Sequence, residues 1–356
     1  MNTKKMRYVW FLVILCIFCL TLFLARTRSK VEMRNRIYHQ WNEHFVVSKG
    51  KESYVRTTND SNQTVVLSEA QSYGMLITVA AAKKGQAQQA DFDRLYQYYL
   101  NHRLEGTQLM SWKQTIRNGK AKDEDHNATD GDLYIAYALL KAAQQWPKQA
   151  KDYQAQAKAI LEDILAHNYN EETGVLTVGN WANQDSEFYH LMRTSDTLPA
   201  QFQIFYEVTK DSKWLDIKEK MLQQLQTISS QTKTGLLPDF IWVDEQGTRV
   251  ADPKTIECRL PYNLVQSKDA TSQKLVKKML NFFKSQRNLY AGYDLKGKAL
   301  NNHQAASFLA PIVYASEHEK GYLKLVQQNK YIFTQDLPLN NYYDATMTTM
   351  IALELF

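Results

Sequence analysis

The chain has 356 residues and a formal net charge of +6, and its 13 glycines and 7 prolines are few for that length. Scarce turn-forming residues favour helices over many short strands. Lysines and arginines are scattered along the sequence rather than gathered in one basic stripe, so the charge does not indicate a nucleic-acid partner. The 21 tyrosines and 7 tryptophans supply aromatic faces, which suit a protein core and also stack on sugar rings.

An apolar run near the N-terminus, residues 8–25 (YVWFLVILCIFCLTLFLA), predicts a transmembrane helix. Its 18 residues fall within the roughly 17–25 that a helix needs to cross a bilayer. A cleavable signal peptide is the alternative, but such peptides have a shorter apolar core and end in small residues, whereas this run ends in Leu24-Ala25-Arg26. We therefore predict an uncleaved anchor. Three basic residues flank the run on each side, so charge does not decide its orientation.

The remainder of the chain shows no low-complexity tract, linker or break in composition. We expect a cytoplasmic stub and anchor at residues 1–30, a juxtamembrane segment at 31–50, and a single domain at 51–356. Cys16 and Cys19 lie in the apolar run, which leaves Cys258 as the one cysteine of that domain, so no disulfide can form within it.

Amphipathic segments separated by short loops fill the predicted domain. The clearest has apolar residues at 133, 136, 137 and 140, the i, i+3, i+4, i+7 spacing of one helix face. Helices paired through one uninterrupted domain predict an all-α array of helical hairpins, and the lack of a strict residue repeat favours a closed toroid over a common solenoid. Residues 174–178 and 240–243 are the strand-like exceptions. The predicted helices are 93–104, 132–145, 148–166, 197–208, 212–228, 273–283, 304–315 and 342–355.

Two acidic stretches each precede an apolar helix. Ser68, followed three residues later by a glutamine, reads as a capping box that makes Ser68 the N-cap and places Glu69 in the first turn. Thr129 followed by Asp132 is a looser version of the same pattern, and it places Asp130 in a first turn. Acids at such positions commonly do no more than complement the helix dipole.

Two features favour chemistry over capping alone. Asp130 and Asp132 flank a glycine, and an aromatic residue accompanies each stretch, Tyr73 beside Glu69 and Trp112 ahead of Asp130. Cleavage of a glycosidic bond needs one protonated carboxyl for the leaving oxygen and one ionised carboxylate to activate water or attack directly. Partial burial or a like-charged neighbour raises the pKa of a carboxyl group, and these stretches offer both conditions.

Both stretches resemble glycoside hydrolase family 8. Residues 128–140 (ATDGDLYIAYALL) are similar to the family signature, and 68–75 (SEAQSYGM) resemble the segment that carries its acid, with Ala70 where glycine is usual. Further stretches at 180–181, 235–239 and 342–346 follow in family order, so the likeness covers roughly residues 40–356.

The resemblance implies an (α/α)6 barrel, an inverting mechanism and β-1,4-linked glycans as substrates. Glu69 matches the proton donor, and Asp130 matches an aspartate that binds the sugar being cleaved and is sometimes described as a nucleophile. Trp112 and Trp181 resemble stacking aromatics of the cleft. The remaining substrate-binding candidates are Tyr73, Asp132, Asp196, Arg259 and Tyr343.

One departure concerns the general base. The family's usual base is an aspartate in a Tyr-Asp-Ala-x-Arg stretch, which here reads TIECR, so Arg259 fits but Ile256 stands where the aspartate is expected. Glu257 is one position away, and a shift of one residue turns a helical side chain by about 100°. Glu257 is the candidate base, and Asp196, where an aromatic is commoner, and Asp244 are alternatives.

Two functions follow from these observations. The first is an enzyme that hydrolyses β-1,4-type glycosidic bonds in an extracellular polysaccharide, an exopolysaccharide or a β-glucan. The alternative is a catalytically impaired glycan-binding or scaffold protein that assists polysaccharide export at the membrane, which the isoleucine at 256 supports. Retention of Glu69, Asp130 and Asp132 favours the enzyme. Cellulose, xylan, chitosan and a self-made exopolysaccharide all suit such a cleft, and endo or exo action stays open.

We expect no cofactor and no metal, because the sequence has no His-Glu-x-x-His pattern and the acidic stretch 123–126 reads as an exposed loop. The expected partners are the polysaccharide, the membrane through the N-terminal helix and a polysaccharide synthase complex, with no nucleic acid. We expect a monomeric catalytic domain outside the cell membrane, or a secreted form if the N-terminal segment is cleaved.

Overall fold

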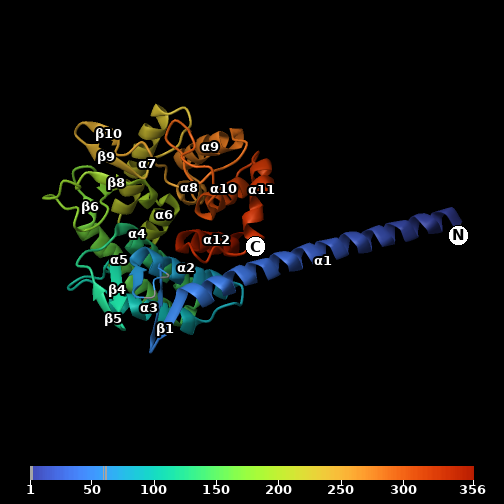
Figure 1. Ribbon diagram of the computed structural model, residues 1–356, viewed down its shortest axis with the longest axis horizontal. Helices are drawn as coiled ribbons and strands as arrows, with labels where there is room; N and C mark the ends of the chain where they lie inside the picture. Colours follow the sequence, from blue (N-terminus) through green and yellow to red (C-terminus); the bar gives the residue numbers. More distant parts are fainter. Residues whose placement is uncertain (1–2, 59, 61) are drawn as a thin grey trace.

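The computed structural model describes residues 3–58, 60 and 62–356, and most of them are helical (Figure 1). Each predicted helix is confirmed, with ends that shift by a few residues. The helices are α1 Thr3–Phe45, α2 Ser68–Lys83, α3 Gln89–Asn101, α4 Thr129–Gln145, α5 Ala150–His167, α6 Pro199–Thr209, α7 Lys213–Gln231, α8 Leu260–Val265, α9 Ala270–Ser285, α10 Ala306–His318, α11 Leu323–Asn329 and α12 Tyr342–Leu355.

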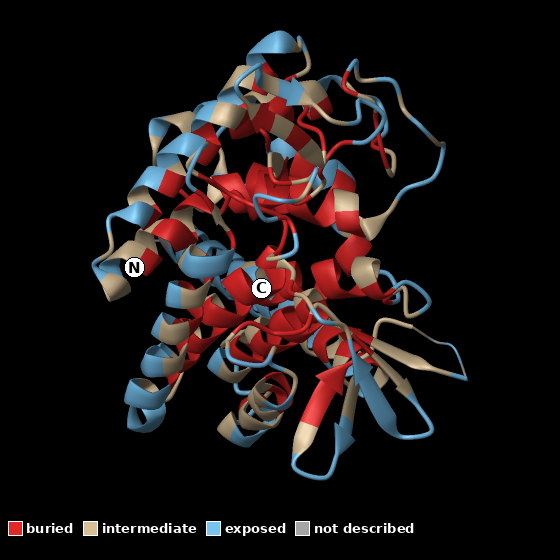
Figure 2. Ribbon diagram, turned by 90° about the vertical axis from the view of Figure 1, so that its left-hand side faces the viewer, coloured by how far each residue is buried: buried red, intermediate tan, exposed pale blue. Residues whose placement is uncertain are grey.

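Within the described residues, neighbouring helices pack as hairpins: α2 with α3, α4 with α5, α6 with α7, α8 with α9, and α10 with α11. A further pair joins the two ends of the chain, because α12 packs against α1. The first members and α12 form an inner ring, which closes where α12 contacts α2. Figure 2 shows buried ribbon gathered in the interior and exposed ribbon around it. This arrangement is consistent with an (α/α)6 fold.

Composition decides which helices lie inside. The inner helix α4 has its charged residues confined to the first turn and Lys141, and most of its side chains are buried. The outer helix α7 buries a single stripe that includes Trp214, Ile217, Met221 and Leu225, and its other faces are charged or polar. One apolar stripe on a polar helix covers a core, whereas a helix that is apolar on most faces must lie within it.

The long helix α1 has two halves with different surroundings. Residues 8–25 are exposed, and this helix is long and apolar enough to cross a membrane by length and composition. From Arg34 onwards the helix enters the core, where Trp41 is fully buried and its indole nitrogen donates to the Thr346 hydroxyl at 3.0 Å. Much of the segment expected to be a juxtamembrane connector at 31–50 thus supplies the outer partner of α12.

Short antiparallel strands lie in the loops between helices. The strand-like stretches expected at 174–178 and 240–243 form β7 and β9, whereas the other strands were not predicted, because they are short and one of them, β5, is fully exposed. The strands are β1 Val46–Lys49, β2 Glu52–Val55, β3 Thr64–Leu67, β4 Lys113–Arg117, β5 Lys120–Asp123, β6 Tyr169–Asn170, β7 Val175–Leu176, β8 Leu191–Arg193, β9 Phe240–Asp244 and β10 Gly247–Val250.

The predicted capping roles of Ser68 and Thr129 are wrong. Leu67 and Ala128 are the N-caps of α2 and α4, and neither helix has a side-chain cap. Thr129 instead donates its hydroxyl to the Thr177 carbonyl oxygen at 2.6 Å. The buried Ser68 hydroxyl has no hydrogen-bond partner among the described residues. Both side chains are turned towards a neighbouring element, so tertiary contact overrides the local capping pattern.

Candidate active site

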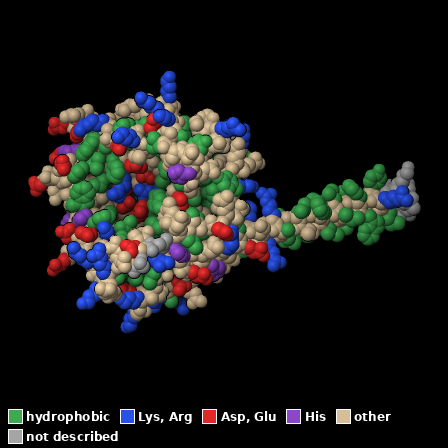
Figure 3. Space-filling model, in the orientation of Figure 1, with side chains coloured by type: hydrophobic (Ala, Val, Ile, Leu, Met, Phe, Trp, Pro, Cys, Tyr) green, Lys and Arg blue, Asp and Glu red, His purple; other side chains and the backbone are tan. Residues whose placement is uncertain are grey.

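The inner helices begin at one end of the ring, and the predicted site residues gather there. Glu69 lies in the first turn of α2, and Asp130 lies in the first turn of α4. Asp196 ends the 3-10 turn Thr194–Asp196 ahead of α6, and Arg259 is the N-cap of α8. Figure 3 shows acidic and basic side chains in a hollow of the domain on the side away from the projecting half of α1.

Gly131 explains why the first turns of α2 and α4 can meet. A Cβ atom at this position would lie 2.2 Å from the Ser68 hydroxyl oxygen and 3.0 Å from the Ser68 carbonyl carbon. Only glycine permits this approach without displacing the Ser68 backbone. The Asp-Gly-Asp pattern therefore brings Asp130 beside Glu69, close enough that its charge raises the pKa of Glu69.

Arg259 is the centre of the cluster. Its Nη1 lies 2.6 Å from Glu69 Oε1, 3.2 Å from the Tyr73 hydroxyl and 3.6 Å from Asp130 Oδ2. Its Nη2 donates to the Ser195 hydroxyl at 2.6 Å, and its Nε donates to Glu257 Oε1 at 3.2 Å. A planar guanidinium with several donors can hold carboxylates in fixed positions around itself. Arg259 thus fixes the proton-donor candidate relative to the base candidate.

The acids of this cluster outnumber its cations, which explains their different pKa values. Burial raises the pKa of Glu69 to about 7 against the pull of Arg259, and burial raises the pKa of Asp196 to about 8 against the pull of Arg193. Carboxylates in excess of the available cations keep their protons more readily in a buried site. The carboxyl groups are Glu69, Asp130, Asp196 and Glu257, and the guanidinium groups are Arg193 and Arg259.

Asp130 is one of the two acids that stay ionised. Burial opposes its charge, but Arg193 and then Arg259 hold the pKa of Asp130 below its usual value. Arg193 Nη1 lies 2.8 Å from Asp130 Oδ2, and the Gly131 backbone N–H donates to Asp130 Oδ1 at 2.9 Å. Arg193 comes from β8 and was not among the predicted residues; it stands just ahead of Asp196 in the sequence, but nothing local marks it as a partner of Asp130.

Glu257 is the other ionised acid. Burial opposes its charge, but Arg259 holds the pKa of Glu257 below its usual value. Its Oε1 accepts from the Arg259 backbone N–H at 3.0 Å, and its Oε2 makes the longest of these contacts, 3.4 Å from Arg259 Nη2. Ile256, in contrast, is buried and its backbone pairs with Pro238. The structure therefore brings Glu257, and not residue 256, to the arginine cluster.

Asp196 differs from the other acids of the cluster because it is almost fully buried and lies further from a cation. It is 1% exposed, and neither of its carboxylate oxygens has a hydrogen-bond partner among the described residues. Its nearest cation is Arg193, with Nη1 3.7 Å from Oδ1. A buried carboxyl without hydrogen bonds is costly to ionise. Asp196 is thus a second acid of the cluster that keeps its proton near neutral pH.

Asp132 and Tyr73 are buried beside the cluster and form hydrogen bonds with other protein groups. Asp132 is fully buried and accepts from the Met110 backbone N–H and the Asn127 amide, each at 2.8 Å. Burial raises the pKa of Asp132 to about 8. Tyr73 is also fully buried, and its hydroxyl accepts from Arg259. Asp132 holds the loop before α4 in place and Tyr73 contacts the central arginine, and their contact with substrate stays a prediction.

Aromatic side chains extend from the cluster along the loops. The Trp112 carbonyl oxygen accepts from the Ser68 backbone N–H at 2.9 Å, directly before Glu69. The Trp112 ring stacks on His126 with centroids 5.8 Å apart, and Trp181, which is 41% exposed, meets both His126 and Phe188 edge-on. Phe188 in turn stacks on Trp242. Tryptophans were expected here, but His126 and Phe188 were not, because only the fold places them between indoles.

Tyr343 lies half-buried in the first turn of α12. Burial raises the pKa of its hydroxyl well above the usual value, although Arg259, the next largest influence, lowers that pKa. Asp244, the other alternative base, instead pairs with Arg249 on the β9–β10 hairpin at 2.6 Å. The structure therefore does not bring Asp244 into the arginine cluster.

These groups define a class of protein. A carboxyl group that holds its proton near neutral pH faces ionised carboxylates across one guanidinium, beside exposed aromatic rings. Acid and base carboxyls of this kind cleave glycosidic bonds. The site is that of a glycosidase.

Comparisons with known proteins identify the family. A profile described as "Glycosyl hydrolases family 8" matches residues 13–354, and the chain belongs to that family. The beta-glucanase of Niallia circulans is 29% identical over 298 residues, which cover 77% of this chain and 72% of that protein. Endoglucanase A of Acetivibrio thermocellus is 26% identical over 310 residues, which cover 82% of this chain and 62% of that protein.

Solved structures support the fold. The ligand-free structure of a beta-1,3-1,4-glucanase from Paenibacillus sp. X4 superposes with a TM-score of 0.81, and the match covers 93% of this chain and 92% of that chain. Its sequence is 23% identical, so this likeness bears on the fold alone.

Proposed function

We propose that this protein hydrolyses β-1,4-type glycosidic bonds in an extracellular polysaccharide by an inverting mechanism, with Glu69 as the proton donor. The observation that carries the proposal is the contrast between Glu69, whose pKa is raised to about 7, and the ionised Asp130 and Glu257 held by the same arginine. A protonated acid and an ionised carboxylate in one site are what acid–base glycoside cleavage requires.

In the proposed reaction, Glu69 donates its proton to the oxygen of the departing sugar as the glycosidic bond breaks. A water molecule attacks the anomeric carbon from the opposite face and gives its proton to the base. Asp130, kept ionised by Arg193, lies beside the acid and stabilises positive charge that develops on the sugar ring. One proton leaves Glu69 and one reaches the base, so proton exchange with solvent restores both groups.

Glu257 is the proposed base. Arg259 bridges Glu69 and Glu257 with a 2.6 Å contact on one side of the guanidinium and a 3.2 Å contact on the other. Two hydrogen bonds and the width of one guanidinium suit the separation of roughly 6.5–9.5 Å between the carboxyls of inverting enzymes. Oε2 makes the longest contact with Arg259, 3.4 Å, and is the oxygen that we propose takes the proton of the water.

The aromatic line from Trp112 to Trp242 supports binding of an extended sugar chain. Sugar rings pack their apolar faces on indole and phenyl rings, as exposed Trp181 permits. The match to proteins named beta-glucanase and endoglucanase agrees with a β-linked glycan as substrate. We infer that the polymer crosses the inner-helix N-termini in contact with this aromatic line.

We also propose that residues 8–25 anchor the enzyme in the cell membrane and that residues 1–7 stay in the cytoplasm. The catalytic domain then lies outside the cell, where it trims a polymer as the producing cell exports it beside a polysaccharide synthase. The exposed apolar half of α1 supports this placement. Protease digestion of intact cells tests it: the domain should be cleaved while a cytoplasmic marker survives.

Product stereochemistry tests the reaction. Proton NMR during hydrolysis of a β-1,4 oligosaccharide should show the α-anomer first, and initial appearance of the β-anomer would end the inverting assignment.

A second function, glycan binding without cleavage, is favoured by the buried Ile256 in place of the family's usual base. Incubation with candidate polymers and assay for new reducing ends separates the two. Binding of a polymer that yields no reducing ends would favour the scaffold.

A further inference from the structure

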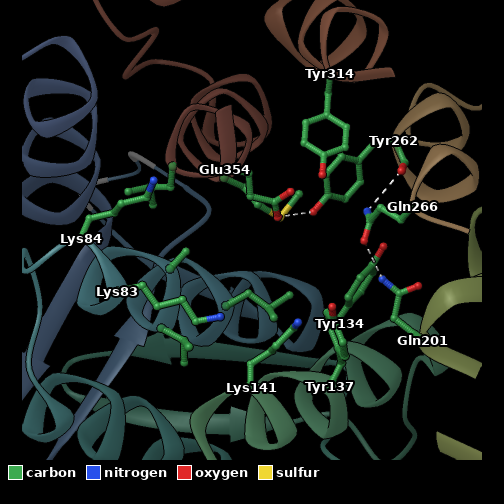
Figure 4. Close-up of a pocket in the computed structure, with 15 residues that line it drawn as sticks. Lys83, Lys84, Tyr134, Tyr137, Lys141, Gln201, Tyr262, Gln266, Tyr314 and Glu354 are labelled. Atoms are coloured by element: carbon green, nitrogen blue, oxygen red, sulfur yellow. Dashed lines mark hydrogen bonds between the residues drawn. The ribbon is translucent and has the colours of Figure 1, made fainter. Parts of the chain in front are cut away.

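A cavity lies inside the ring on the side where α2, α4, α10 and α12 approach their C-termini, and the short inner helices α6 and α8 reach its wall with Gln201 and Tyr262 of their first turns (Figure 4). Its volume is about 420 Å³, within the range of roughly 300–1,000 Å³ typical of small-molecule sites. Each inner helix, or the residue that caps it, contributes to the wall. One representative from each is Lys83, Lys141, Gln201, Tyr262, Tyr314 and Glu354.

The mouth of this cavity faces the direction in which the apolar half of α1 projects. Helices α1 and α12 run antiparallel, because Trp41 bonds to Thr346 whereas Arg34 Nη1 donates to the Phe356 carbonyl oxygen at 2.9 Å. The C-terminal end of α12, with Glu354 on the cavity wall, therefore lies where α1 leaves the domain (Figure 1). If α1 spans a membrane, the acid cluster faces away from the bilayer and this cavity faces it.

Lysine side chains dominate the charge of the cavity. Lys83 and Lys141 both direct their ammonium groups into it, and Lys84 lies at its edge (Figure 4). None of the three forms an ion pair among the residues that the structure describes. Burial and then the charge of Lys83 lower the pKa of Lys141, so the two ammonium groups stand close enough to repel each other.

The helix dipole explains only part of this pattern. Lys83 lies in the last turn of α2, where a cation offsets the partial negative charge of the helix end. Lys141 precedes the last turn of α4, where that effect has faded. The one carboxylate on the wall, Glu354, accepts from the Tyr262 hydroxyl at 2.6 Å, and burial raises its pKa. Glu354 attracts Lys141 through space, and the Lys141 ammonium group lies over the Tyr137 ring, 5.1 Å from its centroid. Three lysines against one carboxyl group still leave the cavity with an excess of cationic groups.

We propose that this cavity binds a phosphate-type anion, and that in the anchored protein the anion is the headgroup phosphate of an acidic membrane lipid. Lysine binds phosphate as a point charge, and basic pockets between helices bind lipid headgroups. The wall also carries Leu76, Val79, Met350 and Leu353, which suit the glycerol and first acyl carbons of a lipid better than a free ion. The choice of lipid rests on the proposed role of α1 as a membrane anchor.

The geometry of α1 permits such contact. Residues 26–33 separate the apolar run from Arg34, and at 1.5 Å per residue they rise about 12 Å. Transmembrane helices commonly tilt by about 20°, and headgroups extend several ångströms beyond the hydrocarbon core. A tilt of α1 towards the side of the cavity lowers the cavity mouth towards the lipid phosphates, and the proposal places the two in contact. The contact would hold the acid cluster at a constant orientation, facing away from the bilayer.

Binding measurements on the full chain in a non-ionic detergent test the proposal. The probes are inorganic phosphate, dihexanoyl phosphatidylglycerol and, as a lipid without net charge, dihexanoyl phosphatidylcholine, each followed by titration calorimetry. We expect saturable binding of the anionic probes, at least tenfold weaker in a Lys83→Gln/Lys141→Gln variant. The matched control is Lys148→Gln/Lys151→Gln, which removes the same charge from exposed positions in the 3-10 turn Pro147–Gln149 and in the first turn of α5 and should change affinity less than twofold.

The probes also separate the two sources of the anion. Tighter binding of phosphatidylglycerol than of phosphate assigns the site to a lipid headgroup, and equal binding assigns it to a free anion. Absence of saturable binding, equal binding of phosphatidylcholine, or equal weakening in both double variants would overturn the proposal. Hydrolysis of a soluble oligosaccharide is measured in parallel: the Lys83/Lys141 variant should keep it, and Glu69→Gln should lose it but bind the anion, so the two proposals fail independently.

Discussion

The two ends of the inner helix ring carry opposite charge chemistry. At the N-terminal end, carboxyl groups crowd around Arg193 and Arg259 within hydrogen-bonding distance. At the C-terminal end, lysines line a cavity without carboxylate partners at ion-pair distance. Each end follows the sign of the helix dipole, which favours anions near N-termini and cations near C-termini. The arrangement places the proposed acid and base at one end of the ring and the proposed anion site at the other.

The difference between the ends lies in how tightly the charges are held. The acids are fixed by a buried network, in which one guanidinium contacts Glu69, Asp130 and Glu257. Such a network separates pKa values: burial raises the pKa of Glu69, and Asp130 and Glu257, which share Arg259 with it, raise that pKa further, whereas the cations hold the pKa values of Asp130 and Glu257 down. The lysines lie on flexible stems around open space, which suits capture of a ligand from outside. The N-terminal end is therefore the preorganised one.

The largest expected effect comes from Glu69→Gln. The amide keeps the size of the side chain but cannot donate the proton, so kcat should fall by about 10²–10⁴-fold. Affinity for a glycan should stay within about threefold of wild type, because the contacts along the aromatic line remain. Steady-state kinetics and equilibrium binding measure the two values. A variant that keeps a tenth or more of wild-type kcat would remove Glu69 from the role of acid.

Glu257→Gln should have the next largest effect, a loss of roughly 10²-fold in kcat if Glu257 activates the water. Azide, a small nucleophile that needs no base, should restore turnover and give a glycosyl azide of inverted configuration. Asp196→Asn is the matched control, because this acid holds its proton and should not be rescued. Asp239 is a second control, since it is only half-buried and hydrogen-bonded to Thr255. Rescue of Asp239→Asn, with Glu257→Gln unresponsive, would transfer the role to Asp239.

The sequence predicted the helices well because their apolar spacing is local information. It placed Glu69 and Asp130 in the first turns of helices for a wrong local reason, since Ser68 and Thr129 do not cap, and nothing local predicted that the two turns meet. The cause is Gly131, which lets one helix start approach another, and a capping pattern contains no such contact. Arg193 could not be found at all, because a strand from a distant part of the chain delivers it to Asp130.

The predicted segment boundary at residue 51 also shows that a local pattern does not reveal contacts between distant parts of the chain. Residues 31–45 read as a polar helix with a few aromatic residues, which also fits a connector. Their burial depends on α12, which lies some 300 residues further along the chain, where Thr346 receives the Trp41 indole. Pairing between the two ends of a chain has no local signature. The resemblance to the family supplied the barrel, and the structure showed which segment completes it.

The dependence of kcat/KM on pH tests the protonation states assigned to Glu69 and Glu257. Because the pKa of Glu69 is raised to about 7, the group is protonated below that pH and loses its proton above it. The value of kcat/KM should therefore fall about tenfold per pH unit on the alkaline side of pH 7. Glu257, with a lowered pKa, should set the acidic limb below its usual value of 4.5. A kcat/KM that rises through pH 7, with circular dichroism unchanged, would contradict this assignment.

Trp181→Ala should have the smallest effect. The ring is 41% exposed beside Phe188, so its loss removes a stacking surface and leaves the arginine network intact. An aromatic contact of this kind contributes about 0.5–1.5 kcal/mol, which corresponds to a roughly 2- to 12-fold rise in KM. Leu323→Ala is the control, since this exposed side chain lies on the outer helix α11. A rise in KM for long polymers, with kcat on a short oligosaccharide unchanged, would place Trp181 on the path of the glycan beyond the cleaved bond. A fall in kcat for both substrates would instead show that the indole supports the acid cluster. Trp181 would then belong to the rigid catalytic network, and glycan binding without an effect on kcat would begin further along the aromatic line.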